Sequence, residues 1–134
     1  MAISKIIVLY GGTSSEREVS LESGAYIYQS IKDLGHSVSL VDYPSEFSLS
    51  SLKKDDFVFI ALHGTDGESG DLQQTLQDHK IPFSGSSFQA CRNTWNKNTC
   101  KKLLQANNIL TPKWVSVSSL SKIKNGFTWV TTSS

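Results

Sequence analysis

The chain has 134 residues, 38% of them hydrophobic and 19% charged, and its 13 Lys and Arg nearly balance its 12 Asp and Glu. This length fits one domain, or one domain with part of a second. The net charge of only +1 gives no basic field of the kind that nucleic-acid-binding proteins use. The longest apolar runs are far shorter than the ~20 residues that cross a bilayer, so we expect neither nucleic acid nor membrane as a partner.

The first part of the chain predicts two strands around a helix. Residues 6–10 form a continuous apolar run before two glycines, which is typical of a parallel strand covered on both faces. Residues 37–41 alternate polar and apolar side chains and predict a second strand. Between them, apolar residues recur at helical spacing and a glycine follows, so we expect an amphipathic helix. Its apolar positions are Leu21, Ala25, Tyr28 and Ile31.

The later part of the chain repeats this alternation. Residues 57–62 give the strongest strand signal, and a helix is predicted to begin near Asp71. A short edge strand at 81–83 tolerates its proline. The order of strands and helices predicts an α/β fold with a mostly parallel sheet. The remaining expected elements are a short helix pinned by Leu49 and Leu52, a helix at 95–106 and a strand at 113–117.

The loop at residues 11–24 follows the first predicted strand, at the sheet edge where open parallel sheets bind ligands. The carboxylate of Glu16 there is suited to a substrate ammonium, and Arg17 to a Glu or a ligand carboxylate. An equally good interpretation is that these charges cap a helix start in solvent. The loop contains neither a GxxxxGK[ST] nor a GxGxxG motif.

The loop at residues 63–73 directly follows the strongest strand. Its glycines recur every third residue, which disfavours a regular helix and predicts a loop wrapped around a ligand. Asp66 and Glu68 are placed to orient the ring of His63. The alternative, a structural hydrogen bond for a lone His at a strand end, is slightly favoured by spacing alone. The sequence contains no cluster of His, Cys or carboxylate residues at the spacing of a metal site, so we do not expect a metal site.

The two cysteines, Cys91 and Cys100, form no CxxC pair, so free thiols in a reducing cytoplasm are expected. The chain opens with no recognisable secretory leader, which also favours a cytoplasmic location. 

Five segments, taken together, resemble the D-alanine–D-alanine ligases of bacterial cell-wall synthesis, in the order and at the spacing of that family. They are VLYGGTSSEREVSLESG, FIALHGTDGESGDLQ, IPFSGSS, NKNTCKKLL and TPKW, and they cover residues 6 to about 114. The resemblance implies an ATP-grasp ligase that forms the D-alanyl-D-alanine dipeptide for peptidoglycan. In that family, ATP phosphorylates the carboxylate of one D-alanine, and the amine of a second D-alanine attacks the acyl phosphate.

The resemblance also implies a domain organisation. Residues 1–92 correspond to a Rossmann-like (pre-ATP-grasp) domain that forms part of the first D-alanine pocket. Residues 93–134 correspond to a linker helix and the beginning of the ATP-grasp domain, with a further strand near Trp129. The acidic Mg²⁺ ligands of the family have no counterpart in these 134 residues, so the isolated chain is expected to be inactive.

Roles for individual residues follow only from the resemblance. Glu16 matches the glutamate that anchors the ammonium of the first D-alanine, and Ser20 lies in the same motif as a support. His63 matches the histidine near that substrate, with Glu68 as its neighbour. Lys97 matches the lysine that reaches the ATP phosphates, where its positive charge offsets developing negative charge.

The resemblance implies D-alanine, ATP and Mg²⁺ as ligands of the intact enzyme, a cytoplasmic location, and a homodimer formed through the amino-terminal domain. An alternative from another class is a non-catalytic α/β module that serves only in dimerisation or interaction.

Overall fold

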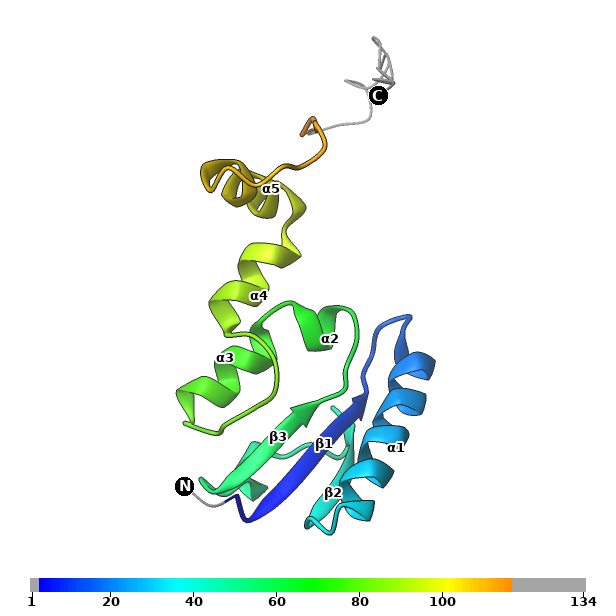
Figure 1. The fold of residues 1–134 in the computed structure, drawn as a ribbon. Helices are drawn as coiled ribbons and strands as arrows, with labels where there is room; N and C mark the ends of the chain where they lie inside the picture. Colours follow the sequence, from blue (N-terminus) through cyan, green and yellow to red (C-terminus); the bar gives the residue numbers. More distant parts are fainter. Residues whose placement is uncertain (1–2, 117–134) are drawn as a thin grey trace. The chain divides into compact units, whose positions relative to one another are not determined.

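The computed structural model describes residues 3–116, and the chain divides into two compact units, Met1–Asn96 and Lys97–Ser134. The sequence predicted a domain boundary between residues 92 and 93. Figure 1 shows the elements of both units. The first unit contains β1 (Lys5–Gly11), α1 (Arg17–Asp33), β2 (Val38–Tyr43), the 3₁₀ helix η1 (Leu49–Ser51), β3 (Asp56–Ile60), α2 (Thr65–Glu68), α3 (Asp71–Asp78) and α4 (Phe88–Trp95). The second contains α5 (Lys97–Ala106).

The three strands form a parallel sheet in the order β2-β1-β3, which confirms the predicted α/β architecture (Figure 1). In the register, Leu9 of β1 faces Val41 of β2 and Ile60 of β3. Val8 and Leu9 are fully buried, as expected for a central strand with both faces covered. The predicted edge strand at 81–83 is reduced to one parallel bridge, between Phe83 and Val58 of β3.

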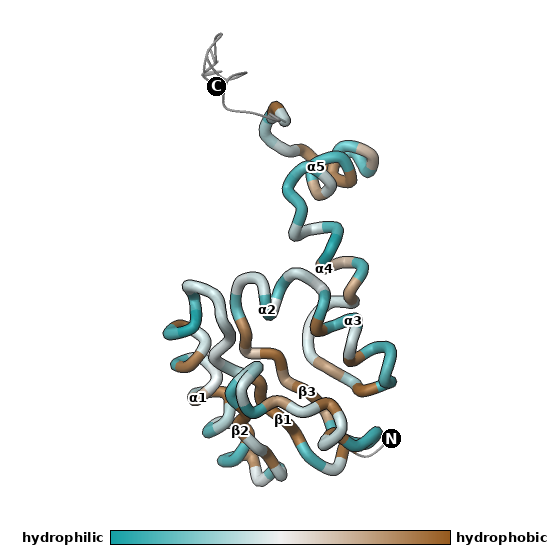
Figure 2. Tube along the Cα trace, turned by 180° about the vertical axis from the view of Figure 1, so that it is seen from behind, coloured by the Kyte–Doolittle hydropathy of each residue, from teal (hydrophilic) through white to brown (hydrophobic). Residues whose placement is uncertain are grey.

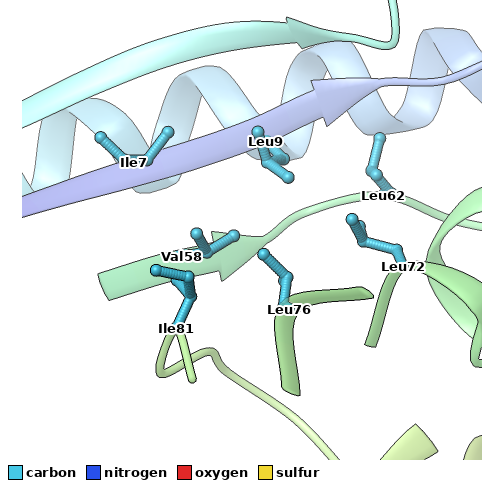
Figure 3. Close-up of a cluster of buried hydrophobic side chains, with 7 residues drawn as sticks. All are labelled: Ile7, Leu9, Val58, Leu62, Leu72, Leu76 and Ile81. Carbon is cyan, nitrogen blue, oxygen red and sulfur yellow. The ribbon is translucent and has the colours of Figure 1, made fainter. Parts of the chain in front are cut away.

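The main core lies on one face of the sheet. Leu72 and Leu76 are spaced four residues apart, so they project from the same side of α3 onto β1 and β3. Figure 3 shows these side chains pointing toward one another, and Figure 2 shows the hydrophobic character of β1 and β3. Burial of each large apolar side chain stabilises the fold by about 1.5–3 kcal/mol. The core consists of Ile7, Leu9, Val58, Leu62, Leu72, Leu76 and Ile81.

The segment after β2 packs against this core as well. Leu49 and Leu52, the residues expected to pin a short helix, are half-buried against it. The helix that they hold is the 3₁₀ turn η1, which confirms the short helix predicted there.

Helix α1 covers the opposite face of the sheet, because Tyr10 alternates with the core residue Leu9 along β1. A Cβ on Gly24 would lie 3.1 Å from the Tyr10 ring and closer still to its Cβ, so the helix approaches the strand closely. The buried positions of α1 are Ser20 and Gly24, whereas Ala25 is exposed. The helix itself is confirmed. The apolar positions predicted for its buried face were wrong in part, because the small residues Ser20 and Gly24 are the ones that are buried against the sheet.

The glycine-rich loop at 63–73 contains a helical turn that the sequence analysis did not expect, α2. Gly67 lies inside it and is buried. A Cβ there would lie 2.6 Å from the carbonyl carbon of Leu62 and closer to the oxygen. The glycine therefore serves close packing of the turn against the preceding strand end rather than an open loop.

The helix predicted at 95–106 is confirmed as α5, and another helix that the sequence did not predict, α4, precedes it. Asn96, between α4 and α5, has extended backbone angles (φ −80°, ψ 107°), and α4 begins after Ser87. The Ser87 hydroxyl accepts a hydrogen bond from the Ala90 amide at 3.4 Å and so caps the start of the helix. None of the residues of α4 is buried.

In the second unit, the predicted strand at 113–117 is absent from residues 113–116, and residue 117 lies outside the described part, as does the segment around Trp129. The segment instead bonds to α5. Lys101 donates to Thr111 Oγ1 at 2.8 Å and to the Pro112 carbonyl at 3.1 Å. The indole N–H of Trp114 donates to Asn98 Oδ1 at 3.1 Å.

Candidate functional site

Both loops singled out by the sequence lie at one edge of the sheet. β1 and β3 are parallel neighbours, so the residues that follow them emerge side by side at their carboxyl ends. The loop after β1 leads into α1, and the loop after β3 leads into α2. The expectation that these two loops form one site is consistent with this arrangement (Figure 1).

Hydrogen bonds join the two loops directly. The Ser14 hydroxyl donates to the carbonyl of His63 at 3.1 Å. Asp66 Oδ2 accepts hydrogen bonds from the Thr13 amide and from the Thr13 hydroxyl, the latter at 2.9 Å. The Glu16 amide donates to Ser14 Oγ at 3.2 Å, so the same hydroxyl supports the start of α1. These bonds fix the spacing of the loops before any ligand binds.

Ser20 lies beneath the loops and is fully buried. Its hydroxyl donates to the carbonyl of Ala61 at 2.6 Å and accepts from the amide of Gly11 at 2.9 Å. The one hydroxyl hydrogen is therefore used within the protein. The structure places Ser20 as a brace between the ends of β1 and β3, one helical turn after Glu16.

Glu16 is the residue that precedes α1, and its side chain is exposed. A Cβ on Gly64 would lie 2.8 Å from Glu16 Oε2 and 2.9 Å from Ser14 Oγ, so the carboxylate rests against the second loop at Gly64, the residue after His63. Only a glycine fits at position 64, where φ is also +68°. No hydrogen bond or ion pair engages the Glu16 carboxylate among residues 3–116, which leaves it available to a cation.

The half-buried ring of His63 has a different partner from those proposed. Its Nε2 lies 3.2 Å from the hydroxyl oxygen of Ser23 on α1. Asp66 is engaged by the first loop, and no hydrogen bond joins the exposed Glu68 to the imidazole in the described part of the chain. The suggestion that Asp66 orients the ring was therefore wrong, since its carboxylate joins the loops instead.

Arg17 pairs with a carboxylate of the protein. Its guanidinium forms two hydrogen bonds with Asp42 on β2, at 2.8 and 2.6 Å, and a third with the carbonyl of Gly12 at 3.1 Å. The guanidinium holds the pKa of Asp42 below its usual value, chiefly through these hydrogen bonds. The pair ties the start of α1 to the end of β2, and it leaves Arg17 committed to the fold.

Lys97 is exposed and is the first residue of α5, in the second unit. Residues 3–116 contain no group of three or more His, Cys, Asp or Glu side chains able to hold a metal ion. None of the helices in this range combines the length and hydropathy that spanning a bilayer requires.

A cavity of about 450 Å³ lies at the other end of the strands, between the sheet and the segment after β2. Its lining includes Lys5, Ser37 and Lys53 and none of the loop residues described above. The candidate site at the carboxyl edge is thus separate from this cavity.

The pairing of Arg17 with Asp42 predicts a specific pH dependence of stability. Because the folded pKa of Asp42 is lowered, the pair stabilises the fold above the ordinary Asp pKa of about 4, and this contribution is lost as the pH falls through the lowered pKa. Asp42→Asn should reduce the free energy of unfolding at pH 7, and the difference from the parent should shrink near pH 3. Urea unfolding at both values measures this.

The control for this experiment is Asp55→Asn, which removes an exposed carboxylate without an ion pair in the described residues. It should change stability little at either pH. An Asp42→Asn deficit of the same size at pH 3 and pH 7 would contradict the role given to the ion pair.

The parallel layer and its two bonded loops define an α/β domain of the kind that forms the amino-terminal portion of ATP-grasp ligases. No family model matches the chain. Curated proteins do: the chain is 38% identical to the D-alanine–D-alanine ligase of Aquifex aeolicus over 122 residues, and 40% identical to the D-alanine–D-alanine ligase B of Clostridium perfringens over 120 residues. These matches cover 90% and 89% of this chain, but 42% and 40% of those proteins.

Solved structures give the same result. The D-alanyl-alanine synthetase A of Vibrio cholerae matches with a TM-score of 0.76 and 32% identity, over 92% of this chain and 44% of that one. The D-alanine–D-alanine ligase of Bacillus anthracis complexed with ATP matches with a TM-score of 0.74 and 32% identity, over 90% and 45%. The chain is thus homologous to part of the D-alanine–D-alanine ligases and spans about two fifths of their length, which confirms the resemblance seen in the five sequence segments.

Proposed function

We propose that this chain is the amino-terminal, substrate-binding part of a D-alanine–D-alanine ligase, and that its two edge loops hold the first D-alanine. The observation that carries the proposal is the uncommitted carboxylate of Glu16 against Gly64, at the carboxyl edge of the sheet. A carboxylate in a fixed position pairs with an ammonium group through charge-assisted hydrogen bonds. Holding the ammonium orients the rest of the amino acid for reaction.

Of the other residues of this site, some contact the substrate in the proposal and one supports the site from within the fold. His63 contacts the same substrate, and Glu68, which is exposed on α2, approaches it from the second loop. Ser20 acts from below, since its buried hydroxyl holds the two strand ends together. A site built in this way is preorganised, because the bonds that shape it exist without the ligand.

The nucleotide part of the proposal rests on Lys97 and on the homologues. A relative from Bacillus anthracis is described as complexed with ATP. We place Lys97 at the ATP phosphates and residues 93–134 at the beginning of the ATP-grasp domain. The described residues do not themselves make a Mg²⁺ site, since no cluster of three or more suitable side chains occurs among them, so we assign no step of the reaction to that ion here.

The proposal includes a cytoplasmic location, a role in peptidoglycan synthesis, and a homodimer formed through the first unit. The exposure of Val19 and Tyr26, 58% and 69%, on the same side of α1 supports self-association, because large apolar side chains on a helix face favour contact with a partner. No observation favours a purely non-catalytic module over the ligase.

A chimeric enzyme tests the proposal. Residues 1–96, the first compact unit, replace the matching segment of the Clostridium perfringens ligase B, and dipeptide formation from ATP, Mg²⁺ and D-alanine is followed by mass spectrometry. We expect D-alanyl-D-alanine from the chimera and none from the 134 residues alone. A chimera that folds cooperatively and binds ATP but forms no dipeptide would contradict the proposal, as would full turnover by the 134-residue chain.

A further inference from the structure

The contact between Ser23 and His63 bears on the chemical state of the histidine. The Ser23 hydroxyl oxygen lies 3.2 Å from Nε2 of the ring, and both side chains are half-buried. Either atom can serve as donor in principle, because a neutral imidazole has one N–H and one bare nitrogen. The other hydrogen bonds of Ser23 decide between these two arrangements.

Ser23 lies on α1, and its hydroxyl faces two carbonyl groups of the preceding turn. The oxygen is 2.9 Å from the carbonyl of Val19 and 3.3 Å from that of Ser20. Serine in a helix commonly donates to the carbonyl four residues earlier. A hydroxyl has one hydrogen, and the shortest contact of the Ser23 hydroxyl is the one to the Val19 carbonyl, so the hydrogen is donated there. The Ser23 oxygen can then only accept a hydrogen bond from the ring, through one of its lone pairs.

We infer that Ser23 is a positioning residue that holds His63 as the Nε2–H tautomer, with Nδ1 as the ring nitrogen that meets the ligand. Nδ1 has no hydrogen-bond partner in residues 3–116. While the ring is neutral, Nδ1 accepts a hydrogen bond, so the group it contacts is a donor such as a substrate ammonium. The identity of that ligand rests on the proposed function, whereas the tautomer does not.

The tautomer is measured by long-range ¹H–¹⁵N NMR on the 134-residue chain with ¹⁵N-labelled histidine, at alkaline pH where free imidazole is neutral. The chain has three histidines, so the signals of His63 are assigned with His63→Gln. We expect a protonated, pyrrole-type Nε2 and a bare, pyridine-type Nδ1. A pyridine-type Nε2 in the parent chain would overturn the inference without any variant.

Ser23→Ala then tests the role of the hydroxyl. Loss of one hydrogen bond of ordinary strength should speed exchange of the Nε2 proton with water by about tenfold. The matched control is Ser30→Ala, because Ser30 donates to the carbonyl four residues earlier on the same helix, at 2.9 Å, without contacting a histidine. Ser30→Ala should leave the His63 signals unchanged. Unchanged exchange in Ser23→Ala would overturn the inference.

These results separate the inference from the proposed function. A chimera that forms no dipeptide would remove the ligase assignment and leave the NMR spectrum of His63 as predicted. A wrong tautomer would remove the role of Ser23 and leave the dipeptide assay unaffected.

Discussion

Replacing Glu16 with glutamine in the chimeric ligase is expected to lower kcat/KM for the first D-alanine by about 100-fold. Glutamine keeps the size of the side chain and one acceptor oxygen, but it loses the charge that pairs with the ammonium. In the complete site the bound substrate covers this carboxylate, and removing one member of a buried, hydrogen-bonded charge pair typically costs about 2–5 kcal/mol, which corresponds to roughly 30-fold or more in affinity. Initial rates over a range of D-alanine concentrations measure the effect.

The matched control for this experiment is Glu22→Gln. Glu22 is exposed on α1, and its loss changes the net charge by the same amount. Kinetics within about twofold of the parent chimera are expected for Glu22→Gln. The same result for Glu16→Gln would remove Glu16 from the substrate site.

Gly67→Ala is expected to destabilise the first unit by about 3 kcal/mol, at the upper end of the usual range for overpacking. The added methyl group meets the backbone carbonyl of Leu62, which cannot rotate away as a side chain can. In an open helix the same change stabilises by up to ~1 kcal/mol, so the sign of the effect reports the close contact. Gln73 also holds this turn, through a buried hydrogen bond of 2.6 Å to the carbonyl of Gly67.

Urea unfolding of the 134-residue chain measures the loss, with Thr65→Ala as the control. Thr65 is exposed and lies in the same helical turn, so its replacement should change stability by no more than about 0.5 kcal/mol. Equal stability of Gly67→Ala and the parent would show that the turn relaxes freely, contrary to the packing described here.

The sheet could be predicted from the sequence because its strands depend on local composition. Continuous apolar runs such as residues 6–10 and 57–62 leave few alternatives to a covered parallel strand. Helix α4 was missed because it is only eight residues long, so a helical repeat has little room to show in the sequence. The capping serine at position 87 was the available signal.

The candidate site could be predicted only in part. Its two loops were evident, because each follows a predicted strand at the ligand-binding edge of the sheet. The bonds between the loops join residues far apart in the chain: Thr13 and Asp66 are 53 positions apart, and Ser23 and His63 are 40 apart. No local pattern identifies such partners.

Asp42 is an intermediate case. It lies at the end of β2, where the parallel register places it beside Tyr10 of β1. A carboxylate at that edge of the sheet was a signal for a partner of Arg17, but the sequence analysis named only a Glu or a ligand carboxylate as that partner. The structure resolves this because two hydrogen bonds from one guanidinium require the fixed geometry of a folded pair.

The most direct test of the account is a crystal structure of the chimera with ATP and D-alanine. The account predicts the ammonium of the first D-alanine within hydrogen-bonding distance of a carboxylate oxygen of Glu16, about 2.7–3.2 Å, with the ring of His63 against the same molecule. An ammonium held by other groups, with the Glu16 carboxylate left in solvent, would contradict it.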